Sequence, residues 1–577
     1  MAFLAKFLLL AALFIDVATC TSKEAYLTVR EQVLAKDASS ATGWDQTLEG
    51  KEWAVNDVLM RFKGEDIAKG RNTSVFPPAT HFFLAKEDIE KSEVFKIIKM
   101  MPKGSNLHGH DTALADIDWL VKNATYRPHC YMCLVDLRDT IHFRFSESPL
   151  NDTSECEWKL VETERENSDD VEEFDQMLYD RISFVVDDPI TKYGNQNEVW
   201  TYFEDYFTAA DGLVYYAGVF KDYYKQGLKE SLEDGGLYIE TRAALSPIYE
   251  LDGSQNDSAE NTLLQYMEAN DEFLKENPEY FGSKIIHASF RVFDKASVAA
   301  HIDTAIDLRK KYPDFMVGFD LVNQEDQTKT HLELIDELLL PSQRGEDLPY
   351  FFHAGETNWY GTDVDENLID ALLLNTTRIG HGIAGIKHPW VLQQIKERDI
   401  PIEVNPVSNQ VLMHIHDLRN HPASFFLSED YPIVISSDGN VVFGSLPLSH
   451  DYYEAFVGMA SAKADLRLLK RLIVNSIRYS ALSEKEEGRY MDMWNSRWEV
   501  FLDDVLVKYN ITNWEDFIPS APPTSAPETT AAATERLGTV SDGVTSVNQF
   551  TTAPFLWLVV TIAAYFTICN DVVQNGC

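Results

Sequence analysis

Residues 105–111 read SNLHGHD, with two histidines one residue apart behind a short apolar stretch. Side chains of a strand repeat every two residues, so the imidazoles of His108 and His110 point to the same side. Three later segments also end an apolar, β-branched stretch in polar side chains: HAGET (353–357), RIGHG (378–382) and ISSDG (435–439). Residues at the C-terminal mouth of a barrel strand have this layout. The pattern predicts an α/β fold, a (β/α)8 TIM barrel of the metal-dependent hydrolase type.

Apolar runs that alternate with amphipathic segments of helical length favour parallel strands joined by helical crossovers. Residues 96–515 are therefore expected to form the barrel. Residues 21–95 read as an N-terminal helical extension, and residues 121–190, which carry three cysteines and an acidic run, read as an insertion after strand one. The expected strands two to eight are GLYIETRA (236–243), KIIHASF (284–290), FMVGFDL (315–321), PYFFHAGE (349–356), TRIGHG (377–382), PIEVNPVSN (401–409) and PIVISSD (432–438).

The two ends of the chain suggest export. Residues 1–20 have the layout of a secretory signal peptide, and residues 516–554 that of a Pro/Ser/Thr-rich stalk. Residues 555–577 form a hydrophobic tail that matches a GPI-attachment signal or a short membrane segment. We expect an extracellular protein, secreted or tethered to the cell surface through this tail. Six glycosylation sequons agree with that location: Asn72, Asn123, Asn151, Asn256, Asn375 and Asn510.

Composition and net charge limit the classes of molecule that the protein can bind. The chain has 577 residues, of which 45% are hydrophobic, so it can bury a large core. With 50 Lys+Arg against 92 Asp+Glu, its formal charge is −42, and such a surface repels nucleic acid.

Three cysteines lie in the insertion. In an exported chain a disulfide is favoured over a metal site, and we expect Cys133 to pair with Cys156. Cys130 is then left as a free or alternative partner. Cys130 and Cys133 form a CxxC pair, but no second CxxC or His pair completes a zinc site around it.

The polar residues at the strand ends fit a catalytic zinc site, which uses nitrogen and oxygen ligands and keeps one position open for water. We expect one Zn²⁺ per subunit, held by His108, His110, His353 and Asp438. Glu356 would move protons between water and substrate. His381 would donate a hydrogen bond to the attacking oxygen.

The segments MPKGSNLHGHD, FFHAGET, TRIGHG, IEVNPVSNQVL and VISSD resemble the adenosine deaminase family. The signal, the helical extension and the cysteine-containing insertion resemble its extracellular branch, the second-type adenosine deaminases or adenosine deaminase-related growth factors. The resemblance implies hydrolysis of adenosine and 2′-deoxyadenosine to inosine and 2′-deoxyinosine. It also implies a homodimer assembled through the N-terminal helices, a cell-surface receptor for the insertion, and binding of the ribose by Asp111, Trp200 and Glu204.

Two positions depart from the family's pattern for reading the purine. Gly439 stands where members carry a second acidic residue that hydrogen-bonds purine N7, and Asn323 stands where they tend to have a glycine whose N–H meets N3. These departures motivate an alternative, a growth-factor-like binding protein with weak or shifted activity. A two-metal amidohydrolase is disfavoured because the fourth strand has no Lys. An AMP-type deaminase is disfavoured because no Lys/Arg cluster is visible.

Overall fold

The computed structural model describes residues 22–135, 139–151 and 156–519. The predicted signal peptide, the hydrophobic tail and nearly all of the stalk lie outside these residues. No helix of the described part is long and apolar enough to cross a membrane.

Eight parallel strands form the barrel. Two four-stranded groups are joined by single parallel bridges, Phe319 to Tyr350 and Gly109 to Asp438, which close the barrel. The predicted fold is therefore confirmed, although the later strands are shorter than expected. In order around the barrel the strands are β1 (Gly104–His110), β5 (Gly236–Ala243), β8 (Gly282–Phe290), β9 (Met316–Val322), β10 (His353–Ala354), β11 (Ile379–His381), β12 (Ile402–Val404) and β13 (Ile433–Ile435).

Amphipathic helices follow most strands, as the sequence predicts. They include α12 (Ala259–Glu276), α13 (Lys295–Lys311), α16 (Asn367–Leu373), α17 (Pro389–Arg398) and α21 (Leu466–Arg478). Strand residues are buried along β5, β8 and β9. The strand ends at the C-terminal mouth are thereby held on a rigid scaffold, where sites of this fold are built.

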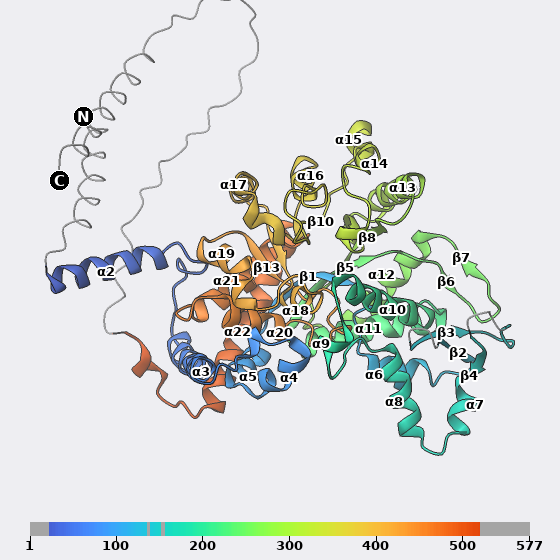
Figure 1. The fold of residues 1–577 in the computed structure, drawn as a ribbon, viewed down its shortest axis with the longest axis horizontal. Helices are drawn as coiled ribbons and strands as arrows, with labels where there is room; N and C mark the ends of the chain where they lie inside the picture. The colour runs from blue at the N-terminus through green and yellow to red at the C-terminus, as the bar shows by residue number, and fades with distance from the viewer. Residues whose placement is uncertain (1–21, 136–138, 152–155, 520–577) are drawn as a thin grey trace, which may run out of the picture. The chain divides into compact units, whose positions relative to one another are not determined.

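The N-terminal helices divide into two parts. The helices α3 (Glu52–Thr73), α4 (Phe82–Lys91) and α5 (Glu93–Met100) pack on the main body, where Glu52 accepts a hydrogen bond from Trp498 of α22 (Glu484–Lys508) at 2.7 Å. By contrast, α2 (Lys23–Ala38) has no buried residue and projects from the body (Figure 1). The extension thus contributes to the core except for its first helix.

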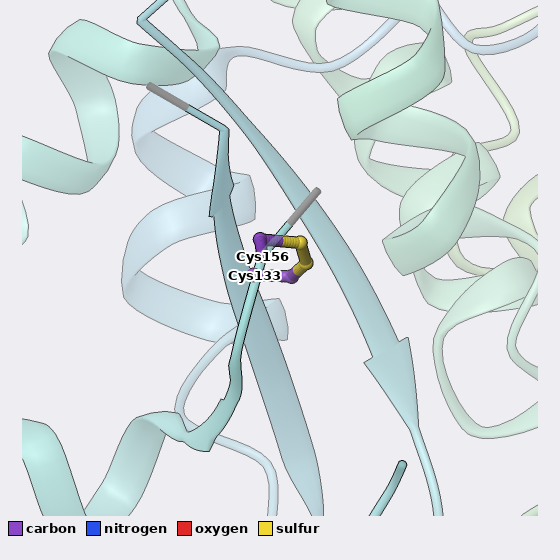
Figure 2. The surroundings of a disulfide bond; sticks show 2 residues. All are labelled: Cys133 and Cys156. Carbon is purple, nitrogen blue, oxygen red and sulfur yellow. A yellow bond between two sulfur atoms is a disulfide. The ribbon is translucent and has the colours of Figure 1, made fainter. Parts of the chain in front are cut away.

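The insertion after β1 is a small antiparallel sheet with two helices. Its strands are β2 (Cys130–Val135), β3 (Thr140–Phe145) and β4 (Trp158–Leu160), followed by α7 (Val161–Glu166) and α8 (Val171–Ile182). Cys133 and Cys156 form a disulfide with a Cα–Cα distance of 5.6 Å (Figure 2), which confirms the predicted pair. Cys130 is buried and free, and burial raises the pKa of its thiol, so it is a poor redox partner.

The helix α10 (Gln196–Val214) is packed closely against this sheet. A Cβ atom at Gly212 would lie 2.1 Å from the carbonyl oxygen of Phe143 in β3, so only glycine permits the approach. The insertion therefore fixes the position of α10 over the mouth of the barrel.

His287 is buried in β8 and makes the stability of the fold depend on pH. Burial lowers the pKa of its imidazole to about 3. Below about pH 6.5 the unfolded chain binds a proton at His287 and the folded chain does not, so this residue lowers the free energy of unfolding by about 1.4 kcal/mol per pH unit. Between about pH 6 and about pH 5, we expect the free energy of unfolding of His287→Leu to rise relative to that of wild type by about 1.4 kcal/mol. Urea unfolding at both values measures it, and an identical pH dependence of the two proteins would contradict it.

Candidate metal centre

Four side chains from three strand ends converge at the mouth of the barrel. His108 and His110 lie on β1, His353 lies on β10, and Asp438 follows β13. Each offers one ligand atom, and the four atoms lie within 4.8 Å of one another. Asp438 is brought to the site by its backbone N–H, which donates to the carbonyl oxygen of His108 at 2.9 Å and closes the barrel there. The structure thus brings together the four residues that the sequence predicts as ligands.

Buried carboxylates orient two of the imidazoles. Nδ1 of His108 lies 2.6 Å from Oε2 of Glu403, and Nδ1 of His353 lies 2.6 Å from Oδ2 of Asp320. With Nδ1 held from behind, Nε2 of each ring faces the site, and the two Nε2 atoms are 3.0 Å apart. This carboxylate–imidazole arrangement is typical of histidines that bind metals.

Two buried arginines hold the carboxylates in turn. Arg242 contacts Asp320 at 2.6 Å and Glu403 at 2.7 Å, while Arg378 contacts Glu403 and Glu240, each at 2.6 Å. All five side chains are fully buried, so removing one partner would leave a buried charge without compensation. Sequence reasoning missed Arg242, Glu403 and this network. The signal was present, because these charged residues interrupt otherwise apolar strands.

The donor set fits a divalent metal ion. Burial, followed by the charge of Arg242, lowers the pKa of His108 well below its usual range and keeps the ring neutral. Burial alone would raise the pKa of Asp438, but its hydrogen bond and charge interaction with His110 hold that pKa well below the usual range. Nε2 of His110 is buried and lies 2.9 Å from Oδ1 of Asp438. Neutral imidazoles with one carboxylate are ligands that zinc prefers.

Glu356 and His381 lie beside this group. Glu356 is 2% exposed, and its Oε1 lies 3.3 Å from Nδ1 of His381 and 3.5 Å from Nε2 of His414. Burial, followed by the charges of Asp438 and Glu325, raises the pKa of the Glu356 carboxyl well above its usual range. A buried carboxyl with a strongly raised pKa beside a metal site is suited to proton transfer.

A chain of hydrogen bonds sets the tautomer of His381. The backbone N–H of Ala423 donates to Nδ1 of His421 at 2.9 Å, so the proton of His421 is on Nε2. That Nε2 donates to Oδ1 of Asn409 at 3.0 Å, and Nδ2 of Asn409 donates to Nδ1 of His381 at 2.9 Å. The neutral His381 ring therefore carries its proton on Nε2, which has no partner and lies beside the site. Sequence reasoning did not identify Asn409 or His421.

A cavity of about 340 Å³ opens from this site. Its lining includes four of the five residues expected to bind substrate: Asp111, Trp200, Glu204 and Asn323. Gly439 is not among them. A Cβ atom there would meet Val442, Ala113 and Phe203 at 3.3, 3.6 and 3.7 Å, and Phe203 is itself part of the cavity lining.

The backbone at Asn323 has a φ of +98°, in the left-handed region that favours glycine. The glycine-like conformation of the family pattern is thus kept although the residue has changed. Its side-chain Oδ1 is buried without a hydrogen-bond partner.

The chain is similar to several known proteins. Family models described as adenosine deaminase and as adenosine/AMP deaminase N-terminal match residues 186–495 and 6–98. The chain is 45% identical to adenosine deaminase 2 of Homo sapiens over 83% of this chain and 94% of that protein. It is 43% identical to an adenosine deaminase of Phlebotomus duboscqi over 81% and 90%. A solved N6-mAMP deaminase of arabidopsis has a TM-score of 0.48 at 15% identity, covering 70% of this chain and 99% of that one.

Proposed function

The chain belongs to the adenosine deaminase family, and we propose that it hydrolyses adenosine and 2′-deoxyadenosine to inosine and 2′-deoxyinosine with release of ammonia. The observation that carries the proposal is the convergence of three imidazoles and one carboxylate beside a cavity whose lining includes His110, His353, Asp438 and the buried Glu356. The alternative of a growth-factor-like binding protein with weak or shifted activity is not favoured, since metal-binding and proton-transfer groups are all in place.

We propose zinc as the metal, held by His108, His110, His353 and Asp438. When bound, the ion would lower the pKa of a water molecule towards neutrality and so supply the nucleophile. The carboxylates of Glu403 and Asp320 keep two of the imidazoles in the orientation that binding requires.

Two side chains of the protein, Glu356 and His381, then transfer a proton and donate a hydrogen bond. Attack by water on the amino-bearing carbon releases a proton, which the Glu356 carboxylate accepts and passes to the adjacent ring nitrogen. His381 donates its Nε2–H to the attacking oxygen as charge develops there. The amino group takes up the second water proton and leaves as ammonia, so adenosine and water give inosine and ammonia.

Purified protein supplied with zinc tests the proposal directly. We expect adenosine to be converted to inosine with equimolar ammonia, measured by chromatography and an ammonia assay. Guanosine and cytidine serve as controls for a contaminating deaminase. The absence of conversion at high concentration of folded, zinc-containing protein would overturn the proposal.

Because residue 439 is a glycine and not an acid, a substitution there tests how the protein binds the purine base. By family resemblance an acid here meets purine N7, and the space around Gly439 admits a side chain if Val442 yields by a few tenths of an ångström. A recovered hydrogen bond is worth about 1–3 kcal/mol. We therefore expect Gly439→Asp to raise kcat/KM for adenosine about tenfold, while Gly439→Ala, which tests the space alone, gives no gain. Equal values for the two variants would contradict the assignment.

We propose that α2 joins two subunits into a homodimer. Its apolar side chains Tyr26, Leu27 and Val33 are all more than 40% exposed, and a cavity of about 530 Å³ lies where the end of α2 meets residues 424–429. Light scattering of the purified protein should give twice the chain mass, and removal of residues 22–38 should give a monomer. A wild-type monomer would refute this.

Export and receptor binding are also proposals. The asparagines of all six sequons are exposed, and the insertion carries a disulfide, as expected of an extracellular glycoprotein. We propose the insertion as the receptor-binding region. Secretion from expressing cells, with a mass decrease on enzymatic removal of N-glycans, tests the export.

A further inference from the structure

Glu356 lies in a sharp turn directly after β10. The backbone at Gly355 has a φ of +76°, in the left-handed region, and a Cβ atom there would lie 3.2 Å from Cβ of Ala384. The carbonyl oxygen of Gly355 accepts a hydrogen bond from the backbone N–H of Ala384 at 2.9 Å. The turn therefore requires glycine, and it leads the chain from the metal ligand His353 to Glu356 within three residues.

The carboxylate of Glu325 binds the N–H groups of this turn. Glu325 is 1% exposed and begins the short helix η3 (Glu325–Gln327), which follows β9. Its Oε2 accepts a hydrogen bond from the backbone N–H of Gly355 at 3.2 Å, and its Oε1 accepts one from the backbone N–H of Glu356 at 3.0 Å. One buried carboxylate thus binds the two consecutive N–H groups that end at the proton-transfer residue.

A chain of buried side chains holds this carboxylate in place. Nδ2 of Asn367, the first residue of α16, donates to Oε2 of Glu325 at 2.8 Å, while Oδ1 of the same amide accepts from the backbone N–H of His331 at 2.7 Å. Nδ1 of His331 donates to the carbonyl oxygen of Asn367 at 3.1 Å, so its Nε2 accepts from Arg291, also at 3.1 Å. Arg291 in turn donates to the carbonyl oxygen of His353 at 2.6 Å. The network therefore holds both ends of the turn.

We propose that Glu325 is a positioning residue for the reaction, which fixes the backbone at Gly355 and Glu356 and thereby aims the Glu356 carboxyl at the substrate. The inference rests on the proposed deaminase function, in which Glu356 transfers the proton. Glu325 is not among the described residues that line the substrate cavity, so it acts through Glu356. A displacement of about 1 Å is enough to slow such a transfer strongly, because it occurs only within hydrogen-bond reach.

Glu325→Gln tests the proposal because the amide has nearly the same shape but presents an NH₂ group to one of the two backbone N–H groups. We expect kcat for adenosine to fall about a hundredfold, with KM and zinc content close to those of wild type. Glu325→Asp keeps both acceptor oxygens on a side chain one methylene shorter and should lose about tenfold in kcat. A kcat within about threefold of wild type in either folded variant would overturn the inference.

Asp234→Asn is a matched control. Asp234 is 2% exposed, and its Oδ2 also accepts from two consecutive backbone N–H groups, those of Leu448 and Ser449, each at 2.8 Å. None of these three residues is among those that line the substrate cavity. We expect Asp234→Asn to lower Tm as Glu325→Gln does but to keep kcat within about twofold of wild type. An equal loss of kcat in the control would count against a positioning role.

A double-mutant cycle shows whether Glu325 acts through Glu356. In the Glu356→Gln background, where the carboxyl to be positioned is absent, Glu325→Gln should lower the remaining kcat by less than about threefold. Losses that multiply would show that Glu325 acts by another route and would overturn the inference.

Hydrogen exchange tests the same contact without turnover. The backbone N–H groups of Gly355 and Glu356 should exchange faster in Glu325→Gln than in wild type, and at the wild-type rate in Asp234→Asn. Unchanged exchange in Glu325→Gln would overturn the inference whether or not the protein is active. A wild-type protein that exchanges as expected but converts no adenosine would refute the deaminase function instead.

Discussion

Replacing Glu356 by glutamine is expected to lower kcat for adenosine about a thousandfold. The amide has nearly the same shape but neither accepts the water proton nor delivers it to the ring. Because the carboxyl is 2% exposed and its pKa is strongly raised, the folded protein gains nothing in stability from this acid. The variant should therefore be at least as stable as wild type.

Three measurements on the same preparation distinguish loss of proton transfer from loss of the site. Steady-state kinetics gives kcat, elemental analysis gives the metal content, and thermal unfolding gives Tm. We expect a large loss in kcat with unchanged metal content and an equal or higher Tm. A kcat within tenfold of wild type would remove Glu356 from its assigned role.

Replacing His110 by alanine should abolish both metal binding and activity. His110 is the most exposed of the four ligand side chains, and its Nε2 lies 2.9 Å from Oδ1 of Asp438, so its removal opens the coordination set with little disturbance of the core. We expect less than about a thousandth of wild-type activity, because the activated water is lost. His416→Ala removes an exposed histidine outside the ligand set and should behave as wild type.

Chelation provides the matching experiment on the wild-type protein. Removal of the metal should abolish activity, and added Zn²⁺ should restore it in wild type but not in His110→Ala. Activity that survives complete removal of metal, verified by elemental analysis, would contradict a metal-dependent reaction.

The sequence predicts most of the barrel because strand and helix patterns are local. The histidine pair on β1 and the apolar run before each later site residue indicate where strands end, and a barrel brings those ends together. Strand lengths are harder to predict. The sequence PYFFHAGE predicts a strand of eight residues, but only His353–Ala354 form a strand in the structure. Tyr350 pairs with Phe319 through a single bridge.

Contacts between residues that are far apart in the chain could not be predicted from the sequence. Nothing local indicates that Glu403 will hold His108, or that His421 will act through Asn409 on His381, because each pair is brought together only by the closed barrel. The backbone at Asn323 is a similar case. The residue type suggested a changed site, whereas the surrounding fold imposes the φ of a glycine.

The central claim is that one metal ion is shared by His108, His110, His353 and Asp438. Crystals of the protein grown with zinc, measured on both sides of the zinc absorption edge, test it most directly. The account predicts a single strong anomalous peak at the mouth of the barrel, within bonding distance of these four side chains. No peak at that position in crystals of protein that deaminates adenosine would contradict it.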